Sequence, residues 1–333
     1  MDLDLVTGGA GFIGSHLVDR LLAAGRRVRA LDNLSSGHRR NLAQHADNAN
    51  LEVAIADACD SEAMGRAMKG VRRVFHLAAL ADIVPSIENP EAYYRSNVGG
   101  TLVTLQAARA AGVKRFIYAA SSSCYGIPDI LPTPEEAAIR PQYPYALTKW
   151  MGESLVLHWA RVYGVPALSL RFFNVYGPRV RTNGAYGAVF GVFLAQMLAG
   201  EPLTIVGDGE QKRDFTYVSD AVDALLRAAE SDRVGRPYNV GSDHPISVNE
   251  LAKLLGARST VSVPKRPGEP DCTWADTARI KAELGWRPAV PVTEGVKRML
   301  AEIEFWRDAP VWTPARIADA TKVWFQYLGD KTV

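Results

Sequence analysis

The chain has 333 residues, of which 47% are hydrophobic and 22% are charged, so it is long enough to bury a sizeable core in one or two domains. Its formal charge of +2 excludes a general basic field for nucleic acid, and no apolar run approaches the ~20 residues of a membrane span. Cys59, Cys124 and Cys272 are scattered, and the six histidines lack ligand spacing. We therefore expect a cytoplasmic protein without a metal site. We also expect no signal peptide, because the first residues already have the pattern of a strand.

Short apolar segments alternate with amphipathic segments over the first half of the chain. Strands are predicted at residues 3–7, 28–32, 51–56, 74–77, 115–119 and 167–171, and helices at residues 13–24, 63–68, 92–111 and 145–163. Several of these strands are apolar on both faces, which is typical of strands buried in a parallel sheet. The alternation predicts an α/β fold with a Rossmann-type doubly wound parallel sheet, which binds ligands at the carboxyl ends of its strands.

Glycine and proline separate shorter elements after about Phe173, and this predicts a smaller α+β domain over the ligand-binding edge of the sheet. A helix at residues 219–229 and a strand at residues 238–240 are expected to return to the first domain. We therefore assign residues 1–172, with returning segments at about 216–242, to a Rossmann domain, and residues 173–215 and 243–307 to a substrate-binding domain. The aromatic tail at residues 308–333 is expected either to cap the core or to contact a second subunit.

A glycine-rich loop follows the first predicted strand and opens the first predicted helix. Residues 9–14 read GAGFIG, which fits G-x-G-x-x-G, and Gly8, Gly11 and Gly14 recur at intervals of three. Glycines let the backbone approach a pyrophosphate, and the helix that follows directs free N–H groups at the anion. Asp32 ends the second strand, where a carboxylate binds ribose hydroxyls and repels a 2′-phosphate. The loop predicts a site for NAD in preference to NADP, and its alternative is a glycine-rich turn without a ligand.

Two later strand ends leave alternatives open. Asp57 and Ala58 follow the third strand and either contact the adenine or begin a helix as an N-cap. His76 ends the fourth strand and is more typical of a hydrogen-bonded core histidine than of a catalyst. The small residues after it, Ala78 and Ala79, would let a cofactor lie close to the backbone.

Tyr145 and Lys149 are four residues apart at the start of a predicted helix, so their side chains share one face. A neighbouring ammonium group and a positive nicotinamide ring would both lower the pKa of the tyrosine from about 10. A run of serines, residues 121–123, follows the fifth strand, and a hydroxyl there can relay a proton from a substrate alcohol to Tyr145. Alone, the pair is typical of a solvated helix face and the serine run of a turn. In this order after the glycine loop, they predict oxidation of an alcohol with a nicotinamide cofactor.

Together these residues resemble the extended short-chain dehydrogenase/reductase family, in particular its nucleotide-sugar epimerases and dehydratases. Further matching motifs are NVGGT at residues 97–101, RFFNVYGPR at 171–179, RDF at 213–215, YNVG at 238–241 and LGW at 284–286. By this resemblance Tyr145 is the catalytic base, Lys149 is its helper and Ser121 is the hydroxyl relay. The resemblance implies NAD contacts from Gly8, Gly11, Phe12, Ile13, Gly14, Asp32, Asn33, Asp57, Ala58, Leu77, Ala81, Asn97, Tyr145, Lys149 and Phe173. It implies substrate contacts from Ser122, Ser123, Asn174, Arg213, Arg266 and Thr273.

The resemblance implies that Asn174, Arg213 and Arg266 hold the diphosphate of a nucleotide-linked sugar. Two guanidinium groups and an amide suit such an anion, although either arginine alone is more typical of a surface cation. By resemblance we also expect a homodimer that forms through the predicted helices at residues 92–111 and 145–163.

The loop after Ser121 indicates which reaction is expected. A 4,6-dehydratase needs an acid and a base besides the tyrosine. Family dehydratases place Asp and Glu directly after the catalytic Thr or Ser, and related decarboxylases keep a Glu in this loop. Here these positions hold Ser122 and Ser123. We therefore expect epimerisation at C4 of a UDP-glucose or UDP-galactose type of sugar through a transient 4-keto sugar.

Other reactions remain as alternatives on the same scaffold: a 4,6-dehydratase, a uronate epimerase, a decarboxylase or a 4-ketoreductase. A non-catalytic NAD-binding regulator would typically lack the Tyr/Lys pair. Two positions depart from related epimerases. Ala81 stands where some of them have a lysine, and Thr273 stands where some that are restricted to unmodified hexoses have a bulky tyrosine. The smaller Thr273 predicts tolerance of an N-acetylated sugar.

Overall fold

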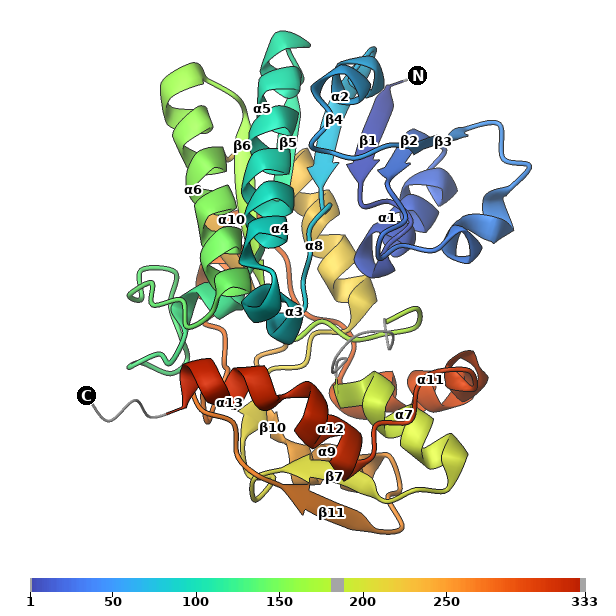
Figure 1. Cartoon of the computed structure of the whole chain (residues 1–333). Helices are drawn as coiled ribbons and strands as arrows, with labels where there is room; N and C mark the ends of the chain where they lie inside the picture. The colour runs from blue at the N-terminus through green and yellow to red at the C-terminus, as the bar shows by residue number, and fades with distance from the viewer. Residues whose placement is uncertain (1, 181–188, 330–333) are drawn as a thin grey trace.

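A seven-stranded parallel sheet forms the centre of the larger part of the molecule (Figure 1). The computed structural model describes residues 2–180 and 189–329, so residues 181–188 of the predicted substrate-binding domain and residues 330–333 of the predicted tail lie outside the described residues. The strand order is β3-β2-β1-β4-β5-β6-β9. The strands are β1 (Leu3–Thr7), β2 (Arg27–Asp32), β3 (Leu51–Ile55), β4 (Val71–His76), β5 (Arg115–Ser121), β6 (Ala167–Phe172) and β9 (Pro237–Val240). This order, which reverses between β1 and β4, confirms the predicted doubly wound α/β fold.

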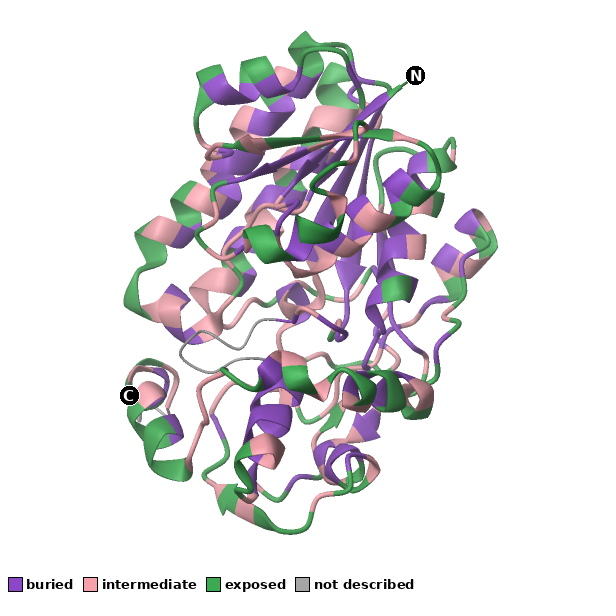
Figure 2. Ribbon diagram, turned by 90° about the vertical axis from the view of Figure 1, so that its right-hand side faces the viewer, coloured by how far each residue is buried: buried purple, intermediate pink, exposed green. Residues whose placement is uncertain are grey.

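Helices cover both faces of this sheet (Figure 1). On one face lie α2 (Ser61–Ala67), α5 (Gly100–Ala110) and α6 (Pro144–Tyr163), and on the other lie α1 (Phe12–Ala23), α8 (Val218–Glu230) and α10 (Ala278–Leu284). Leu105 of α5 and Val156 of α6 are fully buried against the first face, and Leu17 of α1 and Leu225 of α8 against the second. Figure 2 shows the resulting layers, with buried strands between helices that expose their outer sides.

The predicted helix at residues 92–111 is not continuous in the structure. Asn89 caps a short α4 (Pro90–Tyr93) by accepting a hydrogen bond from the Ala92 N–H, and a π-helical turn (Tyr94–Gly99) then leads into α5. Within the wide turn the Asn97 side chain bonds both the N–H and the C=O of Leu80, at 2.8 and 3.0 Å. Hydrophobic periodicity does not reveal such an insertion, because the segments on either side keep a helical pattern.

A smaller α+β part lies beyond the carboxyl ends of the strands. Its elements are α7 (Val189–Ala199), β7 (Leu203–Val206), β8 (Lys212–Arg213), β10 (Ile246–Ser247), α9 (Val248–Leu254), β11 (Thr260–Val263) and α11 (Val292–Ala301). β7 pairs in parallel with β11, and β8 pairs in antiparallel fashion with β10. These elements enclose a second hydrophobic core around Phe190, Ile205 and Leu251. In the described ranges, no helix has both the length and the apolar character needed to cross a membrane.

A buried ion pair joins α6 to β6. The Arg171 Nε donates to both Glu153 carboxylate oxygens at 3.0 Å, and the two side chains are only 6% and 3% exposed. Ser169 donates a further hydrogen bond to Glu153 at 2.7 Å. The other end of the guanidinium reaches the loop after β5, where Nη1 donates to the Tyr125 hydroxyl oxygen at 2.7 Å and to the Glu135 carbonyl oxygen at 2.9 Å.

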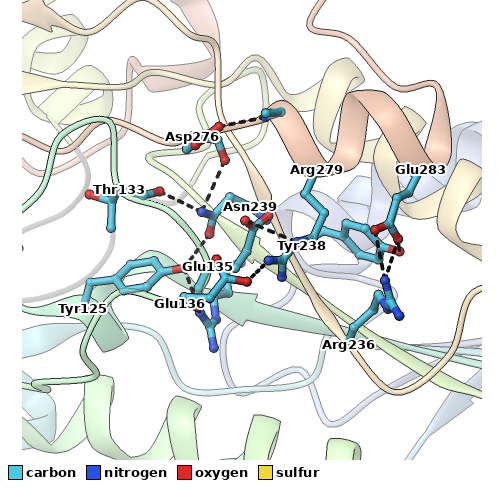
Figure 3. Close-up of polar contacts among 12 residues, drawn as sticks. Tyr125, Thr133, Glu135, Glu136, Arg236, Tyr238, Asn239, Asp276, Arg279 and Glu283 are labelled. Atoms are coloured by element: carbon cyan, nitrogen blue, oxygen red, sulfur yellow. Dashed lines mark hydrogen bonds and ion pairs between the residues drawn. The ribbon is translucent and has the colours of Figure 1, made fainter.

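The network continues from this loop into β9 (Figure 3). The Tyr125 hydroxyl donates to Asn239 Oδ1 at 2.7 Å, and Asn239 Nδ2 donates to the Thr133 carbonyl oxygen at 2.9 Å. The Glu135 carboxylate accepts the Asn239 backbone N–H at 2.9 Å and faces Arg279 of α10 at 3.7 Å. The loop that begins at the end of β5 is therefore held in a defined position by contacts with β6, β9 and α10.

We expect Arg171→Met to lower the free energy of unfolding by about 3–5 kcal/mol, because the Glu153 carboxylate would stay buried without its partner. Arg140→Met is the matched control. Arg140 forms an ion pair of similar length with Asp129, but both side chains are more than half exposed, so we expect a change within about 0.5 kcal/mol. Urea denaturation followed by circular dichroism measures both variants. Equal losses of the free energy of unfolding in the two variants would contradict the claim that burial makes the Arg171–Glu153 pair costly to break.

Candidate active site

A cavity of about 630 Å³ lies between the carboxyl ends of the strands and the smaller part of the molecule. The predicted catalytic and substrate residues all line it, namely Ser121, Ser122, Ser123, Tyr145, Lys149, Asn174, Arg213, Arg266 and Thr273. Most predicted cofactor residues line it as well: Gly8, Gly11, Phe12, Ile13, Gly14, Asp32, Asn33, Asp57, Ala58, Leu77 and Ala81. The fold thus brings together residues that are far apart in the sequence.

Two predicted cofactor residues, Asn97 and Phe173, lie behind the cavity wall. Asn97 is buried and holds the backbone of Leu80, which does line the cavity. Phe173 is buried in a small hydrophobic cluster with Cys124 and Ala275. Neither residue is among those that line the cavity, and the cofactor contacts that the resemblance implies for them stay predictions.

The glycine loop fits closely against itself at the start of α1. Gly8 has a φ of +70°, a conformation that L side chains rarely adopt, and a Cβ on Gly14 would lie 2.0 Å from the Gly8 carbonyl oxygen. No side chain fits at Gly14 without moving this loop. The tight turn brings the N-terminus of the 12-residue helix α1 to the cavity, where free N–H groups and the helix dipole favour an anion.

Asp32 is fixed at the end of β2 by two backbone hydrogen bonds. Its Oδ2 accepts the Ala10 N–H at 3.0 Å and its Oδ1 accepts the Leu34 N–H at 2.8 Å. Each carboxylate oxygen keeps a lone pair for a hydroxyl group, which fits the unmodified ribose of NAD. Nearby Asp57 does not cap α2, because Asp60 accepts the hydrogen bonds from the first turn of that helix. The alternative of Asp57 as an N-cap is therefore wrong.

Ser121 and Tyr145 meet where β5 ends and α6 begins. Pro144 is the first residue of α6, and the side chains of Ser121 and Tyr145 both line the cavity. The Ser121 hydroxyl lies 2.8 Å from that of Ser123 and is close enough to Tyr145 to affect the pKa of its phenol. Burial raises the pKa of Tyr145 above its ordinary value, and the neighbouring Ser121 hydroxyl opposes this rise. The expected lowering of this pKa is therefore absent in the protein alone, where desolvation of the phenolate is the largest effect.

Lys149 lies one turn further along α6 and is almost completely buried. Its Nζ donates a hydrogen bond to the Ala119 carbonyl oxygen at 2.6 Å and lies 4.4 Å from the centre of the Tyr118 ring. Burial lowers the pKa of Lys149 to about 7, although the negative charge of Glu153 opposes the shift. The ammonium group is thus held in one place at the base of the cavity, with a charge that titrates near neutral pH.

His76 is a core residue, as its position in the sequence favoured. Thr101 donates its hydroxyl proton to the Asn97 carbonyl oxygen, so the Thr101 oxygen accepts from His76 Nε2 at 3.0 Å. His76 Nδ1 then accepts the hydroxyl proton of Thr7 at 2.7 Å. Burial lowers the pKa of His76 to about 3, so the imidazole is neutral and fully hydrogen-bonded.

Two guanidinium groups converge at the far end of the cavity. Arg266 Nη1 lies 2.8 Å from one oxygen of Glu269, and Arg213 Nη2 lies 3.8 Å from the other. Thr273 donates its hydroxyl proton to the Asn174 side-chain oxygen at 2.8 Å. This end of the site suits an anion with several oxygen atoms, because two guanidinium groups point toward the same place.

Several lining residues have no place among the sequence predictions. They include Asp82, Tyr143, Glu269 and Trp324. The negative charge of Asp82 also raises the pKa of Tyr145, and the Tyr143 ring stacks on the Tyr145 ring with centroids 6.3 Å apart. Tyr143 is only two residues from Tyr145 in the sequence, and this closeness could have indicated that it lines the cavity. Nothing in the sequence of the tail indicated that Trp324 would reach the site.

Comparisons with known proteins agree with this geometry. A UDP-glucose 4-epimerase of Mycolicibacterium smegmatis is 38% identical over 91% of this chain and 98% of its own length. The crystal structure of a UDP-glucose 4-epimerase from Thermotoga maritima, solved with UDP-glucose, has a TM-score of 0.85 at 37% identity and covers 92% of this chain and 99% of its own. A dTDP-glucose 4,6-dehydratase of Streptomyces venezuelae, solved with NAD, has the same TM-score at 30% identity and covers 92% of this chain and all of its own.

The match to a family extends across the whole Rossmann sheet. Residues 5–241 match the family described as NAD dependent epimerase/dehydratase, a segment that runs from β1 to just beyond β9. It contains the glycine loop, the serine run and the Tyr145/Lys149 pair. The chain therefore belongs to the NAD-dependent epimerase/dehydratase family.

Proposed function

We propose that this protein is an NAD-dependent 4-epimerase of nucleotide-diphosphate sugars of the UDP-glucose/UDP-galactose type. The observation that carries the proposal is that Ser121, Tyr145 and Lys149 line one cavity with two converging arginines. The epimerase names of several relatives support the same conclusion. The chemistry supplied by bound NAD is acceptance of a hydride from C4 and its return to the opposite face of the resulting 4-keto sugar.

The protein's own groups bind the ligands and move the proton. The N-terminus of α1 and the Asp32 carboxylate bind the dinucleotide, and Arg213 and Arg266 bind the substrate diphosphate. Tyr145 takes the proton of the C4 hydroxyl, directly or through Ser121, and returns it in the reverse step. The Lys149 ammonium favours the ionised phenol, because it is buried and fixed by the Ala119 carbonyl oxygen.

The loop after β5 supports epimerisation over dehydration. Ser122 and Ser123 line the cavity beside Ser121, and neutral hydroxyls are poor acids and bases for the removal of water from C5 and C6. A 4,6-dehydratase is the second candidate, because Asp82 places a carboxylate close enough to influence Tyr145. The two reactions give different products from the same class of substrate.

The assembly we propose is a cytoplasmic homodimer that forms through α5 and α6. Large apolar side chains are exposed along this side of the sheet, on the π-helical turn and on α6: Tyr94, Leu147, Val162 and Tyr163. Pairing these helices with a second copy would remove this apolar surface from water. The three cysteines are unpaired, which agrees with a reducing compartment.

Incubating the purified protein with UDP-galactose, without added cofactor, is expected to give UDP-glucose by NMR. Tyr145→Phe should lower kcat by about 10²–10⁴-fold with unchanged NAD content, because it removes the proton-transfer group and leaves the ring. Formation of a 4-keto-6-deoxy sugar would replace the proposal by a dehydratase. Full activity of Tyr145→Phe would remove the tyrosine from the mechanism.

Lys149→Met is expected to raise the stability of the nucleotide-free protein at neutral pH. The pKa of Lys149 is about 7 in the folded chain and 10.5 ordinarily, so between these values the unfolded chain binds more protons. Wild-type stability should therefore rise with pH by up to about 1.4 kcal/mol per unit relative to the variant. The excess of the free energy of unfolding of Lys149→Met over that of wild type is largest at pH 7 and below and is lost toward pH 10.5.

Urea denaturation at a series of pH values measures this difference. Lys114→Met is the control, because Lys114 is exposed and its replacement should give no such slope. A stability difference between Lys149→Met and wild type that does not change between pH 7 and pH 10 would contradict the lowered pKa.

Thr273→Tyr is expected to abolish turnover of UDP-N-acetylglucosamine while UDP-glucose is still converted. Thr273 lines the cavity beside Asn174, and a phenol ring there would occupy the space needed for a C2 acetamido group. NMR of reactions with each sugar measures the ratio of the two kcat/KM values. The idea fails if wild type does not turn over the N-acetylated sugar, or if Thr273→Tyr leaves the ratio unchanged.

A further inference from the structure

The C-terminal tail runs along the smaller part of the molecule, on the side that faces the larger part (Figure 1). The buried Gln196 of α7 donates a hydrogen bond to the Trp312 carbonyl oxygen at 2.6 Å, and α12 (Pro314–Ala320) then packs on β11 with Ile317 buried. The last helix, α13 (Lys322–Leu328), packs on α3 (Ile83–Glu88), which comes after the loop at the end of β4. The tail thus passes beside the cavity with anchored contacts on both sides of it.

Trp324 of α13 is the tail residue that lines the cavity. Its side chain is 1% exposed, and its indole N–H donates to the Pro267 carbonyl oxygen at 2.8 Å. The Arg266 guanidinium carbon lies 5.2 Å from the centre of the indole ring. The indole also meets the Tyr143 ring at a centroid distance of 6.1 Å, and Tyr143 stacks on Tyr145.

We propose that Trp324 is a positioning residue that fixes Arg266 for the diphosphate of the substrate, so that the tail forms part of the substrate site. The inference rests on the proposed function, since it takes the ligand of Arg266 to be a nucleotide diphosphate. The indole contacts one face of the guanidinium, while the N–H donors lie along its edge, where Nη1 pairs with Glu269 at 2.8 Å. The hydrogen bond to Pro267 holds the next residue of the same loop.

Such an arrangement strengthens binding by pre-organisation. An arginine side chain has many rotamers, and a ligand that must order it binds more weakly than one that meets it already in place. Arg266 is itself 5% exposed, so its stem and guanidinium are held by protein contacts, of which Trp324 and Glu269 are two. The order of this loop therefore depends in part on a helix more than 50 residues further along the chain.

The Mycolicibacterium and Thermotoga epimerases are covered over 98% and 99% of their own lengths but over only 91% and 92% of this chain. This chain therefore carries about a tenth of its length outside each of those alignments.

Isothermal titration with UDP tests the proposal in the full-length protein with its bound NAD. Trp324→Leu should raise the Kd for UDP about tenfold, because both the ring face and the N–H are lost, and should raise the KM for UDP-galactose similarly. The kcat should stay within about threefold, since the proton-transfer groups are untouched. Trp324→Phe keeps a ring face and should raise the Kd only about threefold.

Phe325→Leu is the matched control, because Phe325 is the next residue of α13 and its side chain is partly exposed. It should bind UDP as wild type does. Unchanged UDP affinity in Trp324→Leu, with NAD still bound, would overturn the inference and leave the proposed function intact. If wild type binds UDP but does not epimerise UDP-galactose, the proposed function fails, and the Kd comparison still decides the role of Trp324.

A purely structural role would lower NAD content and thermal stability together with UDP affinity. If Trp324→Leu shows this, Trp324→Phe decides the question. If Trp324→Phe binds UDP as tightly as Phe325→Leu does, the proposal is contradicted, because a phenylalanine at position 324 cannot make the hydrogen bond to Pro267.

Discussion

The whole site depends on one buried cation. The proposed mechanism requires a charged Lys149 beside Tyr145, yet burial in the core disfavours that charge. Glu153 lies one turn further along α6, and its negative charge opposes the lowering of the Lys149 pKa. Glu153 is itself buried and is neutralised by Arg171 on β6. Lys149 is thus the first member of a chain of alternating charges that extends across the interface between helix and sheet.

That chain of charges also positions the other half of the site. Arg171 binds Tyr125 and the Glu135 carbonyl oxygen, and these residues belong to the segment directly after the serine run. Tyr125 and Glu135 in turn bind Asn239 of β9 (Figure 3). Glu153, which supports the charge of Lys149, and the loop that follows Ser121 therefore belong to one hydrogen-bonded network. Removing either partner of the Arg171–Glu153 ion pair would therefore alter the contacts of α6 and of the loop after β5.

The sequence was most informative where the physics is local. Each strand of the large sheet was located within a few residues, because a short apolar run between glycines and charged residues has few other interpretations. Gly8 and Gly14 could be recognised because a tight turn before a helix demands glycine. Asp32 could be recognised because it is a carboxylate at the end of the second strand. Tyr145 and Lys149 could be paired because helical spacing alone places them on one face.

The parts that escaped prediction depend on contacts between distant segments. The π-helical turn at Asn97 serves the backbone of Leu80, and no periodicity records that partnership. The upward shift of the Tyr145 pKa results from burial, which the sequence does not give. Trp324 reaches Arg266 only because two short helices cross the molecule after Trp312, and their path depends on packing against β11 and α3.

The comparisons add a reason why the chemistry has to be argued from side chains. An epimerase and a dehydratase superpose on this chain with the same TM-score of 0.85, so the backbone does not separate the two reactions. The difference between the reactions is decided within a few ångströms of Tyr145. Ser122 and Ser123 offer neutral hydroxyls where dehydration needs an acid and a base, while Asp82 offers a carboxylate from the loop after β4. A shared scaffold can therefore carry different reactions through the side chains of its loops, and in this protein Trp324 of the tail also lines the cavity.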